Sequence, residues 1–491
     1  MNPRVYIPQV QEPTTETTAG VLSPVEAAKA GRPYAMTDLG AGERFAFMWS
    51  DTAKYDTGRN GWLVWDGKRF KPDSILEVNR LAAETARAIK KEAAAMPTET
   101  DEQRKQASAL FGFSLKMESR ERMTAMIDVA RFQPGVAVSP DELDKNTFLL
   151  NCENGTLDLC TGTLRPHDRK DLITKLAPAP YIQGRKDARF DRFLEEATGG
   201  DVELSRFLQK LFGYLLTGDT REEKTFFVYG PKNSGKSTLL EASHKVMGDY
   251  ARTINSEMIC KKSFTNSGQA TPELASLRGC RLASGSEIEQ GQHLAEALLK
   301  NLTGGESITA RHLYGHQFQY LPQFKIVLAM NHCPKASADD GAVWRRIVRV
   351  GIDKTVPDDR IDRTLKPYLS DPRKGGIALL AWAVDGCLAW QREGLDPMPE
   401  AVRANTEAYR SECDPLHNFI EDCLTFHPHA WTAANDLLTA YNEHSEDAGI
   451  SERFRVSPRR LGDRLKDFGC ASARRHEGRG WLGVMLKNEE A

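Results

Sequence analysis

Two short apolar runs stand out in the pattern of hydrophobic and polar positions along the chain. Residues 225–229 and 324–330 are rich in branched and aromatic side chains and show little alternation with polar ones. Such runs are typical of strands buried on both faces of a parallel sheet. A weaker run at 281–289 has Ser and Gly where branched residues usually stand and ends in two carboxylates, and we expect it to be a third strand. Amphipathic segments between these runs predict helices, so this part of the chain is expected to form an α/β core.

The region ahead of this core mixes helical and strand patterns. Helices are expected at 38–48, 77–95 and 119–130, an acidic loop at 97–103, a hairpin at 61–70 that turns at Asp66-Gly67, and short strands at 148–159 and 162–165. Two further helices, 189–198 and 202–216, lead directly into the first buried strand. We therefore predict an N-terminal α+β domain at 34–187 and a helical collar at 188–224. Residues 1–33 have few large apolar groups and are predicted to be a flexible tail.

The last part of the chain, beyond an apolar helix expected at 377–390, has a pattern of its own. A helix is expected at 432–447, and Ser457-Pro458 supplies an N-cap and a first-turn proline for a second helix that stops at Gly469. Strands at 471–476 and 481–486 flank a turn at 477–480. Helix, helix and hairpin in this order predict a winged-helix DNA-binding domain at 412–491.

A glycine-rich loop follows the first buried strand and precedes a helix expected at 239–247. It fits the pattern G-x-x-x-x-G-K-S and consists of Gly230, Pro231, Lys232, Asn233, Ser234, Gly235, Lys236, Ser237 and Thr238. The two glycines allow the backbone to curl so that its N–H groups face inward, where the first turn of the helix adds a positive field. Lys236 would contact the β and γ phosphates of ATP, and Ser237 would bind Mg²⁺. A chance glycine loop is the alternative, and the flanking strand and helix argue against it.

Polar residues follow the other two strands of the core. Mg²⁺ requires an acid opposite the loop, and we expect Glu287 there, supported by Glu289; a solvated surface pair is the alternative. Asn331 comes directly after the strand at 324–330, where a sensor of the γ-phosphate would lie. The sequence therefore predicts one nucleotide site at this edge of the sheet.

A hairpin with basic and aromatic residues is predicted between the expected strands at 281–289 and 324–330. Residues 307–314 and 317–320 flank Gly315-His316, which predicts a two-residue turn. Arg311 and His312 lie on its first strand, where a cation and a stackable ring could hold a single strand of DNA. The double arginine Arg345-Arg346 follows farther along the chain.

Composition narrows the class of protein. At 491 residues the chain is long enough for about two to four domains. No run approaches about 18 uncharged apolar residues, and the polar start has no secretory pattern, so we expect no membrane span and a location in the cytosol. Nine cysteines without a C-x-x-C pair fit free thiols in a reducing compartment.

Two local clusters qualify this picture. The formal net charge is −2 overall, but nine Lys/Arg and four Asp/Glu lie between Ser451 and Gly480, which favours a nucleic-acid partner over a merely solvated basic face. Zinc is an alternative for four residues near the end of the core: Cys413, His417, Cys423 and His427. Spacings of about four residues are also what one helix face gives, so packing or solvation of these side chains is the favoured interpretation.

Five segments, in this order and spacing, resemble the superfamily III helicases: GPKNSGKST, SEIE, KNLTGGESITARHLY, FKIVLAMNHCP and AVWRRI. The resemblance is to the helicase half of the phage and plasmid primase-helicase family, which is related to the poxvirus primase-helicase. It implies an AAA+-like P-loop ATPase domain at 225–400 and a hexameric ring that hydrolyses ATP between subunits while moving 3′ to 5′ on single-stranded DNA.

The resemblance also implies roles for individual residues. Lys236 and Ser237 serve phosphate and Mg²⁺, Glu287 looks like the Walker B acid and Asn331 like sensor 1. Lys300 and Arg311 resemble basic positions before and on the hairpin. Arg346 looks like the finger that reaches into the neighbour's site, with Arg345 as the alternative. An acid such as Asp340 in the same subunit is the competing partner for Arg346.

The sequence departs from the family at three points. Glu306 stands where Asp is usual, and Ser234 stands where many members have Asn. Only 33 residues precede Tyr34, so we expect no primase domain and a separate primase or polymerase as a partner.

Two functions therefore compete. The first is an ATP-dependent replicative DNA helicase of a phage, prophage or plasmid, acting on single-stranded and forked DNA. The second is an origin-binding initiator whose ATPase melts or remodels DNA; a small-molecule kinase would leave the hairpin and the basic C-terminus unexplained. The residues expected to bind DNA are Lys300, Arg311, His312, Arg459, Arg460 and Arg464.

Overall fold

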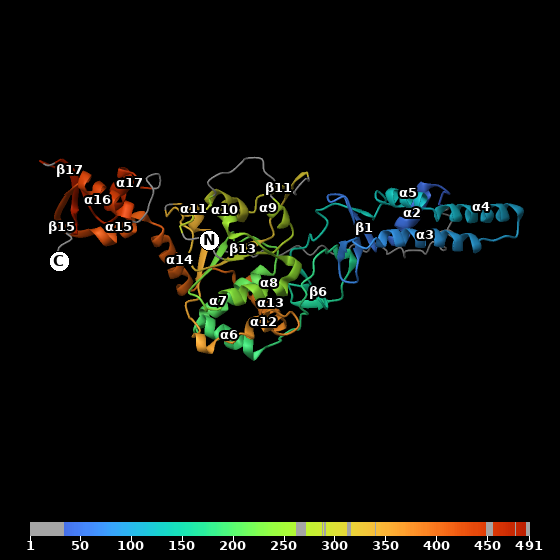
Figure 1. Cartoon of the computed structure of the whole chain (residues 1–491), viewed down its shortest axis with the longest axis horizontal. Helices are drawn as coiled ribbons and strands as arrows, with labels where there is room; N and C mark the ends of the chain where they lie inside the picture. Colours follow the sequence, from blue (N-terminus) through green and yellow to red (C-terminus); the bar gives the residue numbers. More distant parts are fainter. Residues whose placement is uncertain are drawn as a thin grey trace. The chain divides into compact units, whose positions relative to one another are not determined.

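The computed structural model describes residues 34–261, 272–286, 288, 291–311, 316–338, 340–447, 455–476 and 478–487 (Figure 1). The tail predicted at 1–33 lies outside this range. The chain divides into two compact units, Met1–Lys145 with Arg169–Thr174, and Asn146–Asp168 with Lys175–Ala491. None of the helices in the described ranges is both long enough and apolar enough to span a bilayer.

The first unit packs a helical layer against a small sheet. Its helices are α2 (Asp38–Trp49), α3 (Glu77–Ala94), α4 (Asp101–Met117) and α5 (Arg120–Ala130), and its strands are β1 (Ala53–Asp56), β2 (Gly61–Trp65), β3 (Phe70–Pro72) and β4 (Ala137–Val138), in the order β3-β2-β1-β4. The helices predicted at 38–48, 77–95 and 119–130 are confirmed. The hairpin of β2 and β3 is confirmed too, but its turn is longer than the predicted Asp66-Gly67, because Trp65 pairs with Phe70 and residues 66–69 connect the strands. The acidic loop predicted at 97–103 is shorter, because Thr100 and Gln103 form a capping box that starts α4 at Asp101.

A second small sheet belongs to the larger unit. Its strands are β5 (Leu149–Cys152), β6 (Gly155–Asp158) and β7 (Thr163–Arg165). Leu150 and Leu157 share one apolar core with Phe207 of α7 (Val202–Leu215), and the preceding helix, α6 (Ala188–Thr198), contributes to the same core. Residues 146–168 and 175–187 therefore fold with the second unit, whereas the sequence assigned them to a domain at 34–187.

The centre of the second unit is a five-stranded parallel sheet. It consists of β8 (Thr225–Tyr229), β9 (Ala251–Thr253), β10 (Leu282–Ser286), β13 (Lys325–Met330) and β14 (Ile347–Gly351), in the order β14-β8-β13-β10-β9. The predicted α/β class is thereby confirmed. The connection after β8 leads toward β9 on one side, and the connection after β13 leads toward β14 on the other. Neighbouring strands whose connections diverge leave a crevice at their carboxyl ends, the usual ligand site of such sheets.

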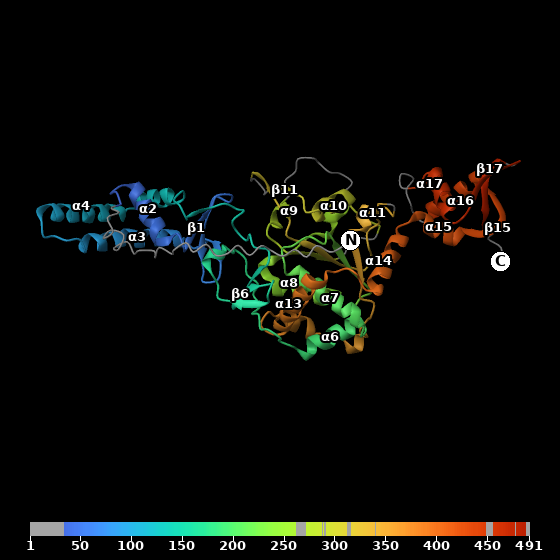
Figure 2. The same ribbon diagram turned by 180° about the vertical axis from the view of Figure 1, so that it is seen from behind.

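Helices surround this sheet. They are α8 (Lys236–Met247), α9 (Pro272–Ser276), α10 (Glu296–Thr303), α11 (Gly341–Trp344), α12 (Leu365–Ser370), α13 (Gly375–Glu393) and α14 (Glu400–Glu412), with short 3-10 turns at Gly248–Tyr250, Ser256–Ile259 and Asp358–Arg360. A further 3-10 turn, Arg169–Asp171, belongs to the first unit. The helices α7 and α13 lie side by side in both views (Figure 1, Figure 2). Tyr214 of the first packs on Trp390 of the second, with ring centroids 4.6 Å apart.

The basic hairpin has a different register from the predicted one. Its strands are β11 (Ile308–Arg311) and β12 (Gln317–Tyr320), and Arg311 is the partner of Gln317. A two-residue turn at Gly315-His316 would instead pair Tyr314 with Gln317, so the predicted register is wrong. Residues 312–315 themselves lie outside the described range. The register is set by packing of alternate side chains across the two strands, such as Ile308 opposite Tyr320, and this packing outweighs the local preference of Gly315-His316 for a turn.

The C-terminal part of the chain has its own apolar core. Its elements are α15 (Pro415–Cys423), β15 (Leu424–Ala433), α16 (Ala434–Asp447), α17 (Pro458–Asp467), β16 (Ala471–Arg475) and β17 (Gly478–Leu486), with the antiparallel sheet order β15-β17-β16. The Ser457 hydroxyl accepts a hydrogen bond from the Arg460 backbone N–H, which confirms the predicted cap of α17. The turn predicted at 477–480 is tighter, because Arg475 already pairs with Gly478.

Candidate functional site

The glycine-rich loop has a backbone that only glycine can adopt at two positions. Gly230 has φ +154°, and a Cβ there would lie 2.1 Å from the Ile352 carbonyl oxygen. Gly235 has φ +93°, and a Cβ there would lie 2.8 Å from the Phe193 ring. The helix α8 begins at once with Lys236, so the unpaired N–H groups of its first turn adjoin the loop. The arrangement forms a concave backbone surface at the carboxyl end of β8.

Lys236 is folded back onto this loop. Its Nζ donates hydrogen bonds to the carbonyl oxygens of Gly230 and Pro231, both at 2.6 Å, and lies 3.2 Å from the Ser234 hydroxyl. The side chain is only 7% exposed, and burial lowers the pKa of its amine, against the opposing charge of Asp353. Its donors are thus held by neutral oxygens, which an anion could replace.

A cavity of about 350 Å³ collects the predicted residues around this loop. Residues 232–238 form one wall of the cavity. The rest of the lining consists of Ser286 at the end of β10, Ala329 within β13 and Asn331 directly after β13. The structure therefore brings Lys236, Ser237 and Asn331 together, although nearly 100 residues separate the last two along the chain. Glu287 and Glu289 lie outside the described residues; Ser286, the residue before Glu287, lines the cavity.

A second pocket, of about 440 Å³, adjoins the loop on its other side and was not predicted. Phe193, Val356, Ile361 and Leu365 give it an apolar part, and its basic residues are Arg189, Arg192, Lys354, Arg360, Arg363 and Lys366. Two of these are paired: Arg189 with Asp362 at 2.7 Å and Lys366 with Glu241 at 2.6 Å. Five of the six cluster in two short stretches, 189–192 and 360–366, which is the signal that could have revealed the pocket.

The double arginine lies at the opposite end of the sheet. The backbone carbonyl of Arg346 accepts a hydrogen bond from the N–H of Thr225, the first residue of β8, at 2.6 Å. The loop follows the last residue of the same strand, and five residues of strand span roughly 16 Å. Neither Arg345 nor Arg346 therefore adjoins the loop of its own chain.

The two arginines differ in their surroundings. Arg346 is 12% exposed; its Nη1 donates to the Ala342 carbonyl at 2.9 Å and its Nη2 lies 3.3 Å from the Glu223 carboxylate. Arg345 is 68% exposed and lies 3.5 Å from the same carboxylate. Asp340, considered above as the partner of Arg346, instead pairs with Lys300 at 2.5 Å and caps α11. The partner is Glu223, because the turn before β8 lies beside the start of β14.

The predicted DNA-binding residues are dispersed. Arg311 is exposed at the end of β11, and His312 lies outside the described residues. On α17, Arg459 is exposed, whereas Arg464 lies 3.5 Å from Asp414 and 3.6 Å from Asp467, with its guanidinium over the Phe468 ring. Exposed basic residues that were not singled out lie on the hairpin of β16 and β17: Arg474, Arg475 and Arg479. Within the described residues, no acid forms an ion pair with these three.

The four residues considered for zinc do not converge. The Cys413 sulfur accepts a hydrogen bond from the Ala336 N–H in the core of the sheet, and His417 lies 3.6 Å from Glu421. Cys423 packs against the separate C-terminal core, and His427 lies on the exposed face of β15. In the part of the chain that the structure describes, no group of three or more His, Cys, Asp or Glu could hold a metal ion.

Comparisons with known proteins agree with the motifs. Residues 42–199 match the family described as D5 N terminal like, and residues 228–346 match a family of unknown function. A proposed helicase of Acanthamoeba polyphaga mimivirus is 28% identical over 303 residues, which cover 57% of this chain and 31% of that protein. A proposed helicase of Frog virus 3 is 26% identical, covering 59% and 30%, and a proposed primase of African swine fever virus is 25% identical, covering 61% and 33%.

The chain thus spans about a third of the length of the curated relatives it matches. Among solved structures, the C-terminal region of NrS-1 aligns over 89% of this chain and 96% of that one, with 9% identity and a TM-score of 0.45. The sequence matches confirm the resemblance of this chain to the helicases and primases of the viral D5-like family.

Proposed function

We propose that this chain is a subunit of an ATP-hydrolysing DNA helicase that works as a ring-shaped homo-oligomer. The observation that carries the proposal is the cavity at the carboxyl ends of β8, β10 and β13, where Lys236, Ser237 and Asn331 face one space. A P-loop, a hydroxyl for Mg²⁺ and a polar sensor on the neighbouring strand are the parts that nucleoside triphosphate hydrolysis requires. The sequence relatives, proposed helicases and primases of viruses, support a role in replication.

The nucleotide would lie across the loop. Lys236 would exchange the carbonyls of Gly230 and Pro231 for the β and γ phosphates, because a charged partner binds an ammonium more strongly than a neutral one. The apolar part of the adjoining 440 Å³ pocket would hold the base, and Arg192 and Lys354 would add positive charge beside it. Asn331 would orient the attacking water.

The oxygen-rich lining of the cavity fits Mg²⁺. Ser237, Ser286 and Asn331 present hard oxygen atoms to the same space, and these are the ligands that Mg²⁺ prefers. Ser237 and Glu287 would hold the ion, which supplies neutralisation of charge on the transferred phosphoryl group.

Catalysis would need a second subunit. Arg346 and Arg345 lie at the amino end of the sheet, so either of them would act on the γ-phosphate of a neighbouring copy and not on that of its own chain. In a ring, each subunit would present this end to the nucleotide of the next. Lys300, Arg311 and His312 would then face DNA in the channel.

A forked DNA with a 3′ single-stranded arm and Mg-ATP tests the proposal directly. We expect ATP-dependent strand separation, ATPase stimulation by single-stranded DNA, and loss of both in Lys236→Ala. A protein that hydrolyses ATP but separates no fork of either polarity would contradict the helicase assignment.

The initiator alternative draws support from the C-terminal part. That part has a core of its own and three exposed arginines on its hairpin, which suits duplex binding by a winged helix. Binding of the full chain to one duplex sequence at least about 10³-fold more tightly than to others would favour the initiator.

A further inference from the structure

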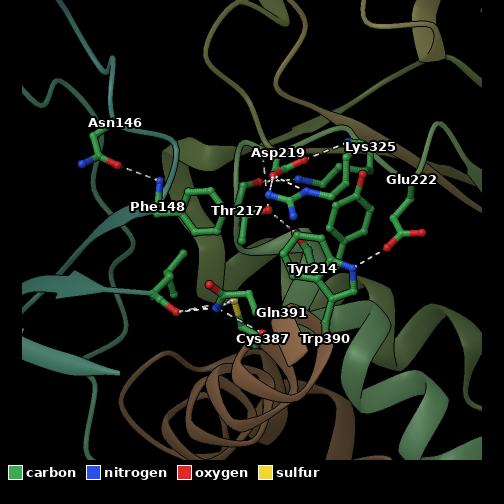
Figure 3. A network of polar contacts seen from close by, with 12 residues as sticks. Asn146, Phe148, Tyr214, Thr217, Asp219, Glu222, Lys325, Cys387, Trp390 and Gln391 are labelled. Atoms are coloured by element: carbon green, nitrogen blue, oxygen red, sulfur yellow. Dashed lines mark hydrogen bonds and ion pairs between the residues drawn. The ribbon is translucent and has the colours of Figure 1, made fainter. Parts of the chain in front are cut away.

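The turn that joins α7 to β8, residues 217–224, is fastened to the core from several sides (Figure 3). The Thr217 carbonyl accepts a hydrogen bond from the buried Lys325 amine, and Trp390 Nε1 donates to the Glu222 carboxylate at 2.6 Å. Asp219 pairs with Arg221, whose guanidinium lies 5.3 Å from the Trp390 ring centroid. The turn therefore holds the residue that follows Glu222 in a fixed place.

That residue, Glu223, has an unusual backbone. Its φ of +51° is in the left-handed region, which is disfavoured for a residue with a Cβ and which glycine adopts freely. Its N–H closes the turn onto the Thr220 carbonyl at 3.0 Å. A side chain at such a position suggests that the side chain has a task of its own.

The carboxylate of Glu223 is shared by the two arginines. It lies 3.3 Å from Arg346 Nη2 and 3.5 Å from Arg345 Nη2. Arg346 is also bound to the Ala342 carbonyl, and its Nε is enclosed, so little of its guanidinium faces outward. An arginine in this state must leave Glu223 before it can touch the nucleotide of another subunit.

We propose that Glu223 is a restraint that competes with the neighbouring subunit's nucleotide for Arg346. The inference rests on the proposed function, since it takes Arg346 as the residue acting in trans. In the separate subunit, Arg346 is neutralised by Glu223. When a second copy presents a bound triphosphate, Arg346 exchanges one anion for another, while Arg345 stays beside Glu223 and keeps that carboxylate neutralised. This exchange explains why two adjacent arginines share one carboxylate: Arg346 leaves Glu223, and Arg345 remains beside it.

The test is the dependence of ATPase rate on protein concentration for wild type and Glu223→Gln. Glutamine keeps the size of the side chain and a carbonyl acceptor but removes the charge. We expect the concentration giving half-maximal ATPase to fall roughly two- to fivefold, the effect of one partly exposed ion pair. Glu400→Gln removes the charge of a surface glutamate that pairs with Arg403 on α14, and it should leave the curve unchanged.

Two further variants keep the result specific. Glu223→Gly removes the carboxylate while fitting the left-handed backbone, and it should give the same fall even if glutamine disturbs the turn. In a protein that already carries Arg346→Ala, Glu223→Gln should not lower the concentration that gives half-maximal ATPase, because the arginine to be released is absent.

An active wild type with an unchanged or higher half-maximal concentration in both Glu223 variants would overturn the restraint while leaving the helicase proposal intact. A fall in the half-maximal concentration that persists in the Arg346→Ala background would also overturn the restraint. A wild type without ATPase at any concentration would instead refute the proposed function, and the restraint with it.

Discussion

The two ends of the central sheet each hold a buried lysine, and the two lysines differ in what surrounds them. At the carboxyl end, Lys236 donates to the carbonyls of Gly230 and Pro231 and lines a cavity of about 350 Å³. At the amino end, Lys325 is 2% exposed, donates to the Thr217 carbonyl and lies 4.7 Å from the Tyr214 ring centroid (Figure 3). Burial lowers the pKa of both amines, and for Lys325 the neighbouring Arg281 charge lowers it further.

The difference shows that burial of a lysine does not by itself mark a ligand site. Lys325 is enclosed by the fold, and Arg281 beside it donates to the carbonyls of Leu216 and Leu149, both at 2.6 Å. Lys325 and Arg281 tie the turn before β8 and the strand β5 to the sheet. Lys236 has similar partners but also an adjoining space that a polyphosphate can enter. Space beside the amine, and not its burial or its pKa, separates the two roles.

The largest expected effect is that of Lys236→Ala on ATP hydrolysis. Loss of the cation that neutralises the transferred phosphoryl group should reduce kcat by about 10³-fold or more, as measured by phosphate release. The unfolding midpoint in urea should stay close to that of wild type, because the hydrogen bonds that the structure gives Lys236 lie within its own loop. A large fall in the stability of Lys236→Ala together with intact ATP hydrolysis would mean that Lys236, like Lys325, has a structural role and does not bind phosphate.

Arg346→Ala tests whether the amino end of one sheet serves the carboxyl end of another. We expect a loss of about 10³-fold in hydrolysis, the lower part of the range for such arginines. Mixing Arg346→Ala with Lys236→Ala subunits should restore part of the activity, since an intact Lys236 can face an intact Arg346 across an interface. If the titration stays flat while both variants assemble, Arg346 only pairs with Glu223 in its own subunit and does not act in trans, and Arg345 becomes the next residue to test.

Lys325→Met tests the structural role of the amino end through pH. A lysine with a lowered pKa binds fewer protons in the folded state than in the unfolded one, so wild-type stability should rise with pH until the unfolded pKa near 10.5. The slope from this group is at most about 1.4 kcal/mol per pH unit. Urea unfolding of wild type and Lys325→Met at pH 7 and pH 9 should show the rise in wild type and a smaller rise in the variant. Parallel curves would mean that Lys325 is charged in the folded protein.

The smallest expected effect concerns the C-terminal part, where one arginine lies beside acidic partners and three others are exposed. Arg464 is neutralised by Asp414 and Asp467, whereas Arg474, Arg475 and Arg479 are exposed without a described acidic partner. Replacing these three by Ala should reduce the slope of log affinity for duplex DNA against log salt by up to about 2.7, from about 0.9 for each phosphate contact. Arg464→Ala should change that slope much less, and a larger change for Arg464 would place α17 against the DNA backbone.

Local chemistry made part of this protein predictable from its sequence. Ser457 caps α17 and Ser119 caps α5 because each side chain bonds to an N–H three residues away. Hydrogen bonds within the glycine loop likewise join residues a few positions apart, so its position is evident from the motif. Where the local signal is weak, prediction failed: α4 buries only three residues, Leu110, Ser114 and Met117, and its amphipathic pattern is correspondingly faint.

The pairing of charges was decided by the tertiary structure alone. The sequence places Asp340 six residues before Arg346, yet the acid beside Arg346 is Glu223, 123 residues away, because β14 lies next to β8. Lys325 donates to the Thr217 carbonyl across 108 residues. Asn331 and Ser237 line one cavity because β13 lies on the other side of β8. A sequence determines which residues end a strand; the order of strands in the sheet determines which of those ends become neighbours, since that order depends on packing of the whole core.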